Sequence, residues 1–147
     1  MATKSDFSAE EWKQLVEGPT TAGLIVLTSA GGGTFRETFA LARAYTDARK
    51  QHGASQLLDE LVAEKPAFDR HRYPSNEKLH DEGLQRLAET AQLLRAKGSP
   101  EDVAAYTDFV LGVATKVAAA HKEDGQEVSP PEQAALDEIR ARLSSPG

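Results

Sequence analysis

An acidic segment near the C-terminus contains the residues of this chain whose types could do chemistry. Asp124, Glu127 and Glu132 surround Gly125, and carboxylate oxygens are the ligands that hard cations such as Ca²⁺ or Mg²⁺ prefer. The acids lack the alternating spacing of an EF-hand loop. The alternative interpretation is a solvated connection in which Glu132 caps the next helix, because Ser129-Pro-Pro-Glu132 has the pattern of a capping box.

A second candidate is Glu77-Lys-Leu-His80, which lies on a predicted helix. The three-residue step places both side chains on one helix face, as in di-iron helical bundles. Those bundles need a second copy of the motif and two further Glu residues, and the sequence holds no second copy. In the alternative interpretation, His80 is a surface residue beside Asp81.

Two other patterns have simpler explanations. His71 and His80 could bind zinc together with an acid, but Arg70 and Arg72 would oppose a cation, which favours a polar loop that pairs its own charges. The Gly31–Gly33 run before a predicted helix could bind an anion. It lacks the Lys of a Walker loop, so a tight turn is favoured.

No nucleophile elbow or His-based triad is recognisable, because the Ser residues mostly stand at predicted helix starts. We therefore predict that the protein is not an enzyme.

Composition bounds the possible partners. The 147 residues include 17 basic and 23 acidic ones, which gives a formal net charge of −6. This acidic balance, with no basic patch, disfavours nucleic acid and anionic membrane surfaces. The chain has no cysteine, which excludes disulfides and thiolate chemistry.

We expect one domain over residues 1–147, with flexible tails at 1–7 and 144–147. The N-terminus leads into a helix start and shows no apolar signal segment. The most apolar run, residues 22–27, is far shorter than the ~20 residues that span a bilayer. The prediction is a cytoplasmic protein without membrane insertion.

Start and stop signals divide the chain into about seven helices and no strand. Pro19 is predicted to end the first helix, because proline disfavours helical geometry at the preceding Gly18. The next segment is rich in β-branched residues but has no strand to pair with, so it is assigned as a helix. The expected helices cover about residues 8–17, 20–30, 34–52, 55–63, 75–97, 100–123 and 129–143.

Two distant stretches, 23–41 and 112–136, have similar sequences. Each has a small apolar helical segment, a loop with Gly, and a Ser/Thr-x-x-Glu helix start with Leu four residues after the Glu. The similarity predicts a compact all-α bundle with two helix–loop–helix units, about 20–45 and 103–140. The units should pack as a pseudo-symmetric centre that residues 54–98 cover.

The second unit resembles the repeated motif of the TerB-like superfamily, the helical domains associated with tellurite resistance. The residues that carry the resemblance are Asp124-Gly125 followed by Val128-Ser129 and Glu132. The resemblance implies an all-helical fold of two such units, with a metal site formed by acidic residues of both loops. Transferred to this chain, that site would comprise Asp124, Glu132 and Glu37.

The chain departs from the family pattern in two places. The second loop has one extra residue, because Gln126 and Glu127 both precede Val128. The first unit has Ala30-Gly31 where the family has Asp-Gly. The resemblance therefore supports the fold more than metal binding.

Three functional hypotheses follow. The first is a non-enzymatic interaction or stress-associated module that binds a divalent metal through Asp124 and Glu132. The second is a structural or adaptor protein that binds a protein partner, or a second copy of itself, through an apolar helical groove. The third is a helical-bundle metalloprotein that uses Glu77 and His80.

Overall fold

In a computed structural model, the described part of the protein comprises residues 3–29, 35–50, 55–64, 75–123 and 130–144. It is all-helical, as predicted. A short 3-10 helix, η1, precedes six α-helices. Their bounds are η1 Lys4–Asp6, α1 Ala9–Ser29, α2 Phe35–Lys50, α3 Gln56–Ala63, α4 Asn76–Lys97, α5 Pro100–Glu123 and α6 Pro130–Ser144.

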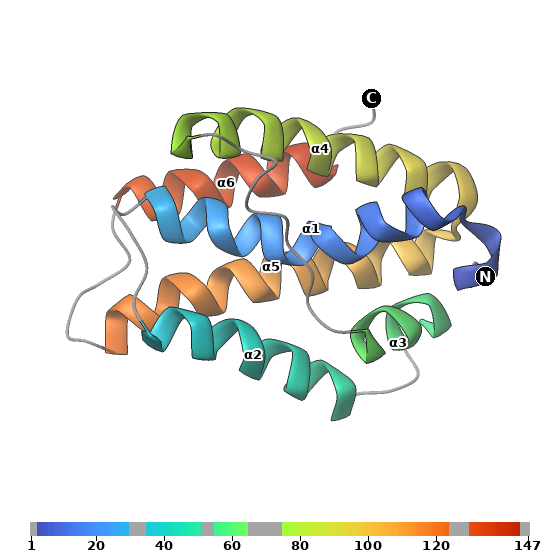
Figure 1. Cartoon of the computed structure of the whole chain (residues 1–147), viewed down its shortest axis with the longest axis horizontal. Coiled ribbons are helices and arrows are strands. Elements are labelled where there is room, and N and C mark those ends of the chain that lie inside the picture. The colour runs from blue at the N-terminus through green and yellow to red at the C-terminus, as the bar shows by residue number, and fades with distance from the viewer. Residues whose placement is uncertain (1–2, 30–34, 51–54, 65–74, 124–129, 145–147) are drawn as a thin grey trace.

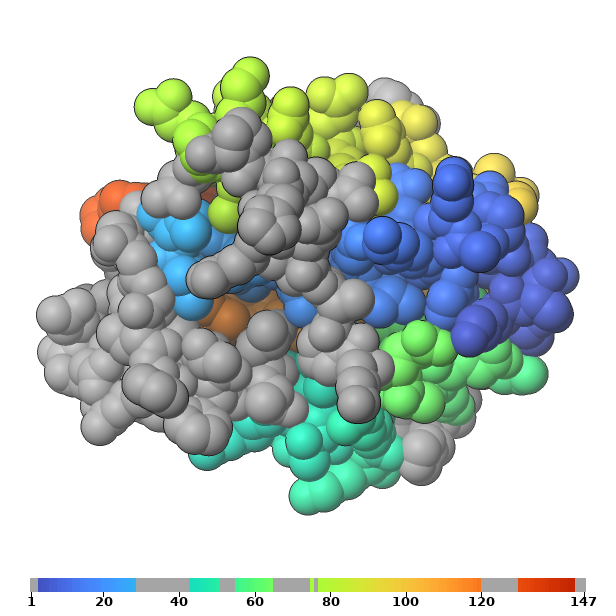
Figure 2. Space-filling view, viewed as in Figure 1, coloured from blue at the N-terminus to red at the C-terminus, as the bar shows by residue number. Residues whose placement is uncertain are grey.

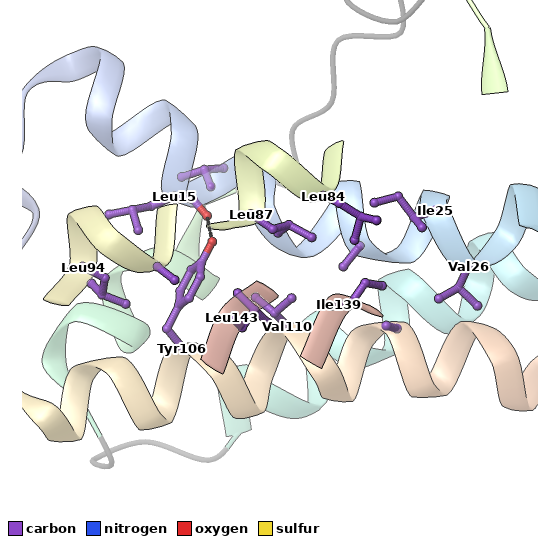
Figure 3. Packing of buried hydrophobic residues seen from close by; sticks show 14 of the residues in the cluster. Leu15, Ile25, Val26, Leu84, Leu87, Leu94, Tyr106, Val110, Ile139 and Leu143 are labelled. Atoms are coloured by element: carbon purple, nitrogen blue, oxygen red, sulfur yellow. Dashed lines mark hydrogen bonds between the residues drawn. The ribbon is translucent and has the colours of Figure 1, made fainter. Parts of the chain in front are cut away.

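The prediction of about seven helices is wrong for the described residues, because the first two expected helices are one. α1 continues through Pro19. A proline inside a helix has no N–H for the carbonyl four residues earlier, and the loss costs roughly 3 kcal/mol. Here that carbonyl belongs to Leu15, and the Tyr106 hydroxyl of α5 donates to it at 2.8 Å (Figure 3). A distant side chain thus replaces the missing donor.

Gly18 makes room for this contact. A Cβ atom built on Gly18 would collide with the Tyr106 hydroxyl oxygen. Burial raises the pKa of Tyr106 well above its usual value of 10, so the hydroxyl keeps the proton that it donates. The Gly18-Pro19 pair has the local sequence pattern of a helix end. In the structure it is the place where Tyr106 of α5 packs on α1.

Figure 1 shows α1 in the middle of the bundle. It packs against α5, α4 and α6, while α2 packs on α5 and α6 packs on α4. Apolar side chains from α1, α4, α5 and α6 meet in one core, which contains Leu15, Ile25, Leu87, Leu94, Val110, Ile139 and Leu143 (Figure 3). No described helix is long and apolar enough to cross a membrane.

The segment before α1 is tied to α3 and α4. The Lys4 ammonium lies 2.8 Å from a Glu64 carboxylate oxygen, and the backbone N–H of Lys4 donates to Glu60. The Lys97 ammonium of α4 lies 2.6 Å from Glu11, at the start of α1. Figure 2 shows η1 and the start of α1 beside α3 on one face of the molecule. Two lysines thus join the first residues to two distant helices.

The sequence Ser8-Ala-Glu-Glu11 has the pattern of a capping box, and this box is present at the start of α1. The Ser8 N–H donates to a Glu11 carboxylate oxygen at 2.8 Å, and the Glu11 N–H donates to the Ser8 hydroxyl at 3.1 Å. The Ser99 box at the start of α5 is closed in the same way by Asp102, whose other oxygen accepts from the Ser55 hydroxyl at 2.7 Å. The first turns of α3 and α5 are therefore joined by one buried carboxylate. The predicted boxes at Thr34 and Ser129 lie outside the described residues.

The Tyr106→Phe substitution should destabilise the protein by about 1–3 kcal/mol, because it leaves the buried Leu15 carbonyl without a donor. Tyr45→Phe is the matched control. The Tyr45 hydroxyl is buried and has no hydrogen-bond partner among the described residues, so its removal should cost almost nothing. Urea unfolding measures both free energies. Equal losses in the two variants would contradict the role given to Tyr106.

Acid should weaken the ties of the N-terminal segment. The hydrogen bond from Lys97 lowers the pKa of Glu11 below its usual value of 4.5, and the hydrogen bond from Lys4 does the same for Glu64. A lowered pKa means that the folded state binds fewer protons than the unfolded chain. The stabilisation is therefore complete above about pH 4.5 and is lost as the pH falls through the folded-state values.

Urea midpoints between pH 6 and pH 3 test this, with fluorescence of Trp12, the single tryptophan, as the signal. The Lys4→Met/Lys97→Met double variant should be less stable at pH 6 and lose less on acidification. The same acid-induced loss in the double variant and the wild type would show that these pairs do not carry the effect.

Candidate binding groove between α2 and α5

The structure locates only part of the predicted metal site. Asp124 lies outside the described residues, and so does the side chain of Glu37, which belongs to α2. Glu132 lies in the first turn of α6 and is 1% exposed. Among the described residues, no group of three or more His, Asp or Glu side chains could hold a metal ion. The three-residue site therefore remains a prediction.

Glu77 and His80 have different surroundings. Glu77 is exposed, while the two ring nitrogens of His80 face carboxylates: Nε2 lies 2.7 Å from Glu138 of α6, and Nδ1 lies 3.3 Å from Asp81. In this arrangement His80 links α4 to α6. The contacts described around His80 favour that structural role over the predicted di-iron motif, and His71 lies outside the described residues.

A groove with a mainly apolar lining lies between α2 and α5 in the described part of the chain. It has a volume of about 380 Å³, within the range of ligand-binding clefts. α2 contributes Ala44, Asp47 and Ala48, and α3 contributes Leu58. α5 contributes Ala105, Asp108, Phe109, Gly112, Val113 and Lys116. These ten residues define the α2–α5 groove.

Small side chains keep the groove open. Ala44 and Ala48 are one helical turn apart on α2, and Ala105 and Gly112 are two turns apart on α5, so each pair shares a helix face. A Cβ atom built on Gly112 would meet no described atom within 4 Å beyond its own stretch of helix. At Gly83, by contrast, a Cβ atom would come within 3.0 Å of Ile25. Internal packing thus explains Gly83 but not Gly112.

Two of the three charged side chains in the groove form an ion pair with each other. The Lys116 ammonium lies 2.8 Å from Asp47, and this hydrogen bond lowers the pKa of the Asp47 carboxyl. Asp108 is exposed and makes no ion pair within the part of the chain that the structure describes. Because Lys116 and Asp47 neutralise each other, Asp108 gives the groove its net negative charge.

Phe109, which forms part of the apolar wall of the groove, is supported by a buried residue. Phe109 lies edge-on against Tyr45, with ring centroids 5.1 Å apart and an interplanar angle of 86°. Tyr45 is 1% exposed, so the wall is held by a fully buried ring. This support favours a preformed groove over one that must be created on binding.

The sequence patterns did not indicate this groove. The small-residue stretches that stand out in the sequence are around Ala22 and Ala118, and both of these residues are fully buried. The alanines of the groove are separated along the chain and come together only when α2 packs on α5. Ala44 and Ala48 at a four-residue step were the one local signal.

The chain matches no protein-family model, no curated protein and no solved structure. The TerB-like resemblance therefore remains a prediction from the sequence.

Proposed function

We propose that this protein is a non-enzymatic interaction module that binds an apolar segment of a protein partner in the α2–α5 groove. The observation that carries the proposal is the open Cβ position at Gly112, in a groove whose Phe109 wall is held by the buried Tyr45 ring. An apolar side chain that leaves water for such a groove contributes about 1.5–3 kcal/mol. A helix that presents several such side chains is a common occupant of grooves between helices.

Filling the groove should abolish binding without harming the fold. The Cβ position of Gly112 is open, so Gly112→Leu extends a side chain into the groove, and replacing a mid-helix glycine should also raise the free energy of unfolding by roughly 0.5–1 kcal/mol. Helical peptides selected from a displayed library against the wild-type protein should bind Gly112→Leu at least tenfold more weakly, by fluorescence anisotropy.

Gln92→Leu is the matched control, because Gln92 is an exposed position on α4 outside the groove. It adds the same apolar group elsewhere and should leave the affinities unchanged. Selected peptides that bind Gly112→Leu as tightly as the wild type would show that the groove is not the interaction surface.

A divalent-metal site is the second candidate, and one feature of the fold favours it. The C-terminal ends of α1 and α5 and the N-terminal ends of α2 and α6 all lie at the same end of the bundle (Figure 1). If α1–α2 and α5–α6 are the two units of a repeat, as in the TerB-like proteins that the sequence resembles, Asp124, Glu132 and Glu37 belong to connected helix ends. Such a site would tie the two units together.

Under this second candidate, Ca²⁺, Mg²⁺, Zn²⁺ or Mn²⁺ should raise the melting temperature, because a ligand that binds only the folded state stabilises it. Asp124→Asn should remove the increase, and Glu77→Gln should leave it unchanged. Calorimetric titration measures the binding directly. A wild-type protein that shows neither heat nor a change in melting temperature with any of the four ions would eliminate this candidate.

A further inference from the structure

A second hollow lies on the other side of α5. It has a volume of about 430 Å³ and is here called the α5–α6 hollow. Its principal lining residues are Val103, Ala104, Thr107 and Asp108 of α5, Leu143 of α6 and Arg95 of α4. In Figure 1, α5 runs between α6 above and α2 below, so the two hollows flank the same helix.

The two hollows are displaced along α5 and meet at Asp108. The α5–α6 hollow involves residues 100–108 of α5, and the α2–α5 groove involves residues 105–116. Asp108 lines both. A straight path from one hollow to the other therefore crosses α5 obliquely, with Asp108 at the crossing point. Helices that pack ridges into grooves cross obliquely in this way.

The other charged groups along this path already have partners. The Lys116 ammonium at one end pairs with Asp47 at 2.8 Å. At the other end, the Arg95 guanidinium donates to the Leu143 carbonyl at 2.6 Å. Asp108 is exposed and makes no ion pair among the described residues. An occupant of the path therefore meets mainly apolar surface on both sides, the exposed Asp108 carboxylate in the middle and the hydrogen-bonded Arg95 guanidinium at one end.

We infer that the occupant is a basic amphipathic helix of a protein partner, which lies obliquely across α5 with its apolar face in both hollows and a Lys or Arg against Asp108. The inference rests on the proposed function and adds the charge and course of the partner. The path spans residues 100–116 of α5, which at 1.5 Å per residue corresponds to about 24 Å, or four to five turns of a partner helix.

The charge of the whole chain supports a basic partner. A formal net charge of −6 attracts cationic segments and accelerates their association. A second copy of this chain would carry the same net charge and would meet Asp108 with an acidic surface. Long-range electrostatics therefore favour a basic segment over self-association.

Two designed helical peptides of 18 residues test the inference. Both carry the same Leu/Ala face, and one has Lys where the other has Glu at the flanking positions. We expect the Lys peptide to bind the full-length protein at least tenfold more tightly than the Glu peptide, by fluorescence anisotropy at low salt. The preference should decrease as salt is added, because exposed charge pairs are screened.

Substitutions then locate the charge. Asp108→Asn should weaken binding of the Lys peptide about threefold to fivefold, as expected for one exposed pair. Asp108→Lys should reverse the preference between the peptides. The matched control is Asp137→Lys, at an exposed position on α6 outside both hollows, which should leave the preference for the Lys peptide in place. Reversal by both variants would overturn the role of Asp108.

The remaining variants separate this inference from the proposal on which it rests. Thr107→Leu adds bulk in the α5–α6 hollow and should weaken the Lys peptide as Gly112→Leu does. Loss with Gly112→Leu but not with Thr107→Leu, or equal binding of the two peptides, would overturn the inference and leave the groove proposal standing. Binding that Gly112→Leu does not change would overturn both. A concentration-dependent dimer in sedimentation that Gly112→Leu abolishes would identify a second copy as the occupant and overturn the basic partner.

Discussion

The hydrogen bond from the Tyr106 hydroxyl to the Leu15 carbonyl is the interaction on which the arrangement of the helices depends. Pro19 leaves that carbonyl without its helical donor, and Leu15 is fully buried, so water cannot replace it. A buried carbonyl without a partner costs about 1–3 kcal/mol. α1 can thus remain one helix inside the bundle only if α5 places a donor at this point. The same bond fixes the position of α5 along α1.

α4 approaches α1 by a different means. Gly83 of α4 lies against Ile25 and Thr21, where a Cβ atom would come within 3.1 Å of both. On the same side, the guanidinium of Arg86 lies 3.8 Å from Glu17, which is 4% exposed. A half-buried ion pair of this kind is weak evidence for net stabilisation, but it places the two charged groups beside each other. The central helix is therefore positioned by a hydrogen bond on one side and by close packing with a charge pair on the other.

The sequence predicted the helical class and most helix boundaries, because capping chemistry is local. Ser8 and Ser99 start helices through bonds to residues three positions away, which a sequence shows directly. It did not predict the continuity of α1, because the donor that rescues Pro19 is 91 residues from Leu15. The groove was missed for a similar reason: its alanines gather only after α2 packs on α5. Of the three predicted metal ligands, only the position of Glu132, in the first turn of α6, could be compared with the prediction.

Three glycines differ in whether the folded chain leaves room for a side chain: Gly18, Gly83 and Gly112. Only 6% of the residues are aromatic, so few large rings are available to fill space between helices. The helices therefore pack closely, and small residues at the contacts allow this. At Gly18 and Gly83 the neighbouring atoms occupy the space that a side chain would take. At Gly112 they do not. A Cβ atom there would meet no described atom within 4 Å beyond its own stretch of helix, and a larger residue would gain helix propensity, so packing around this position gives no reason for glycine. A requirement that lies outside the folded chain, such as the partner helix proposed above, would supply that reason.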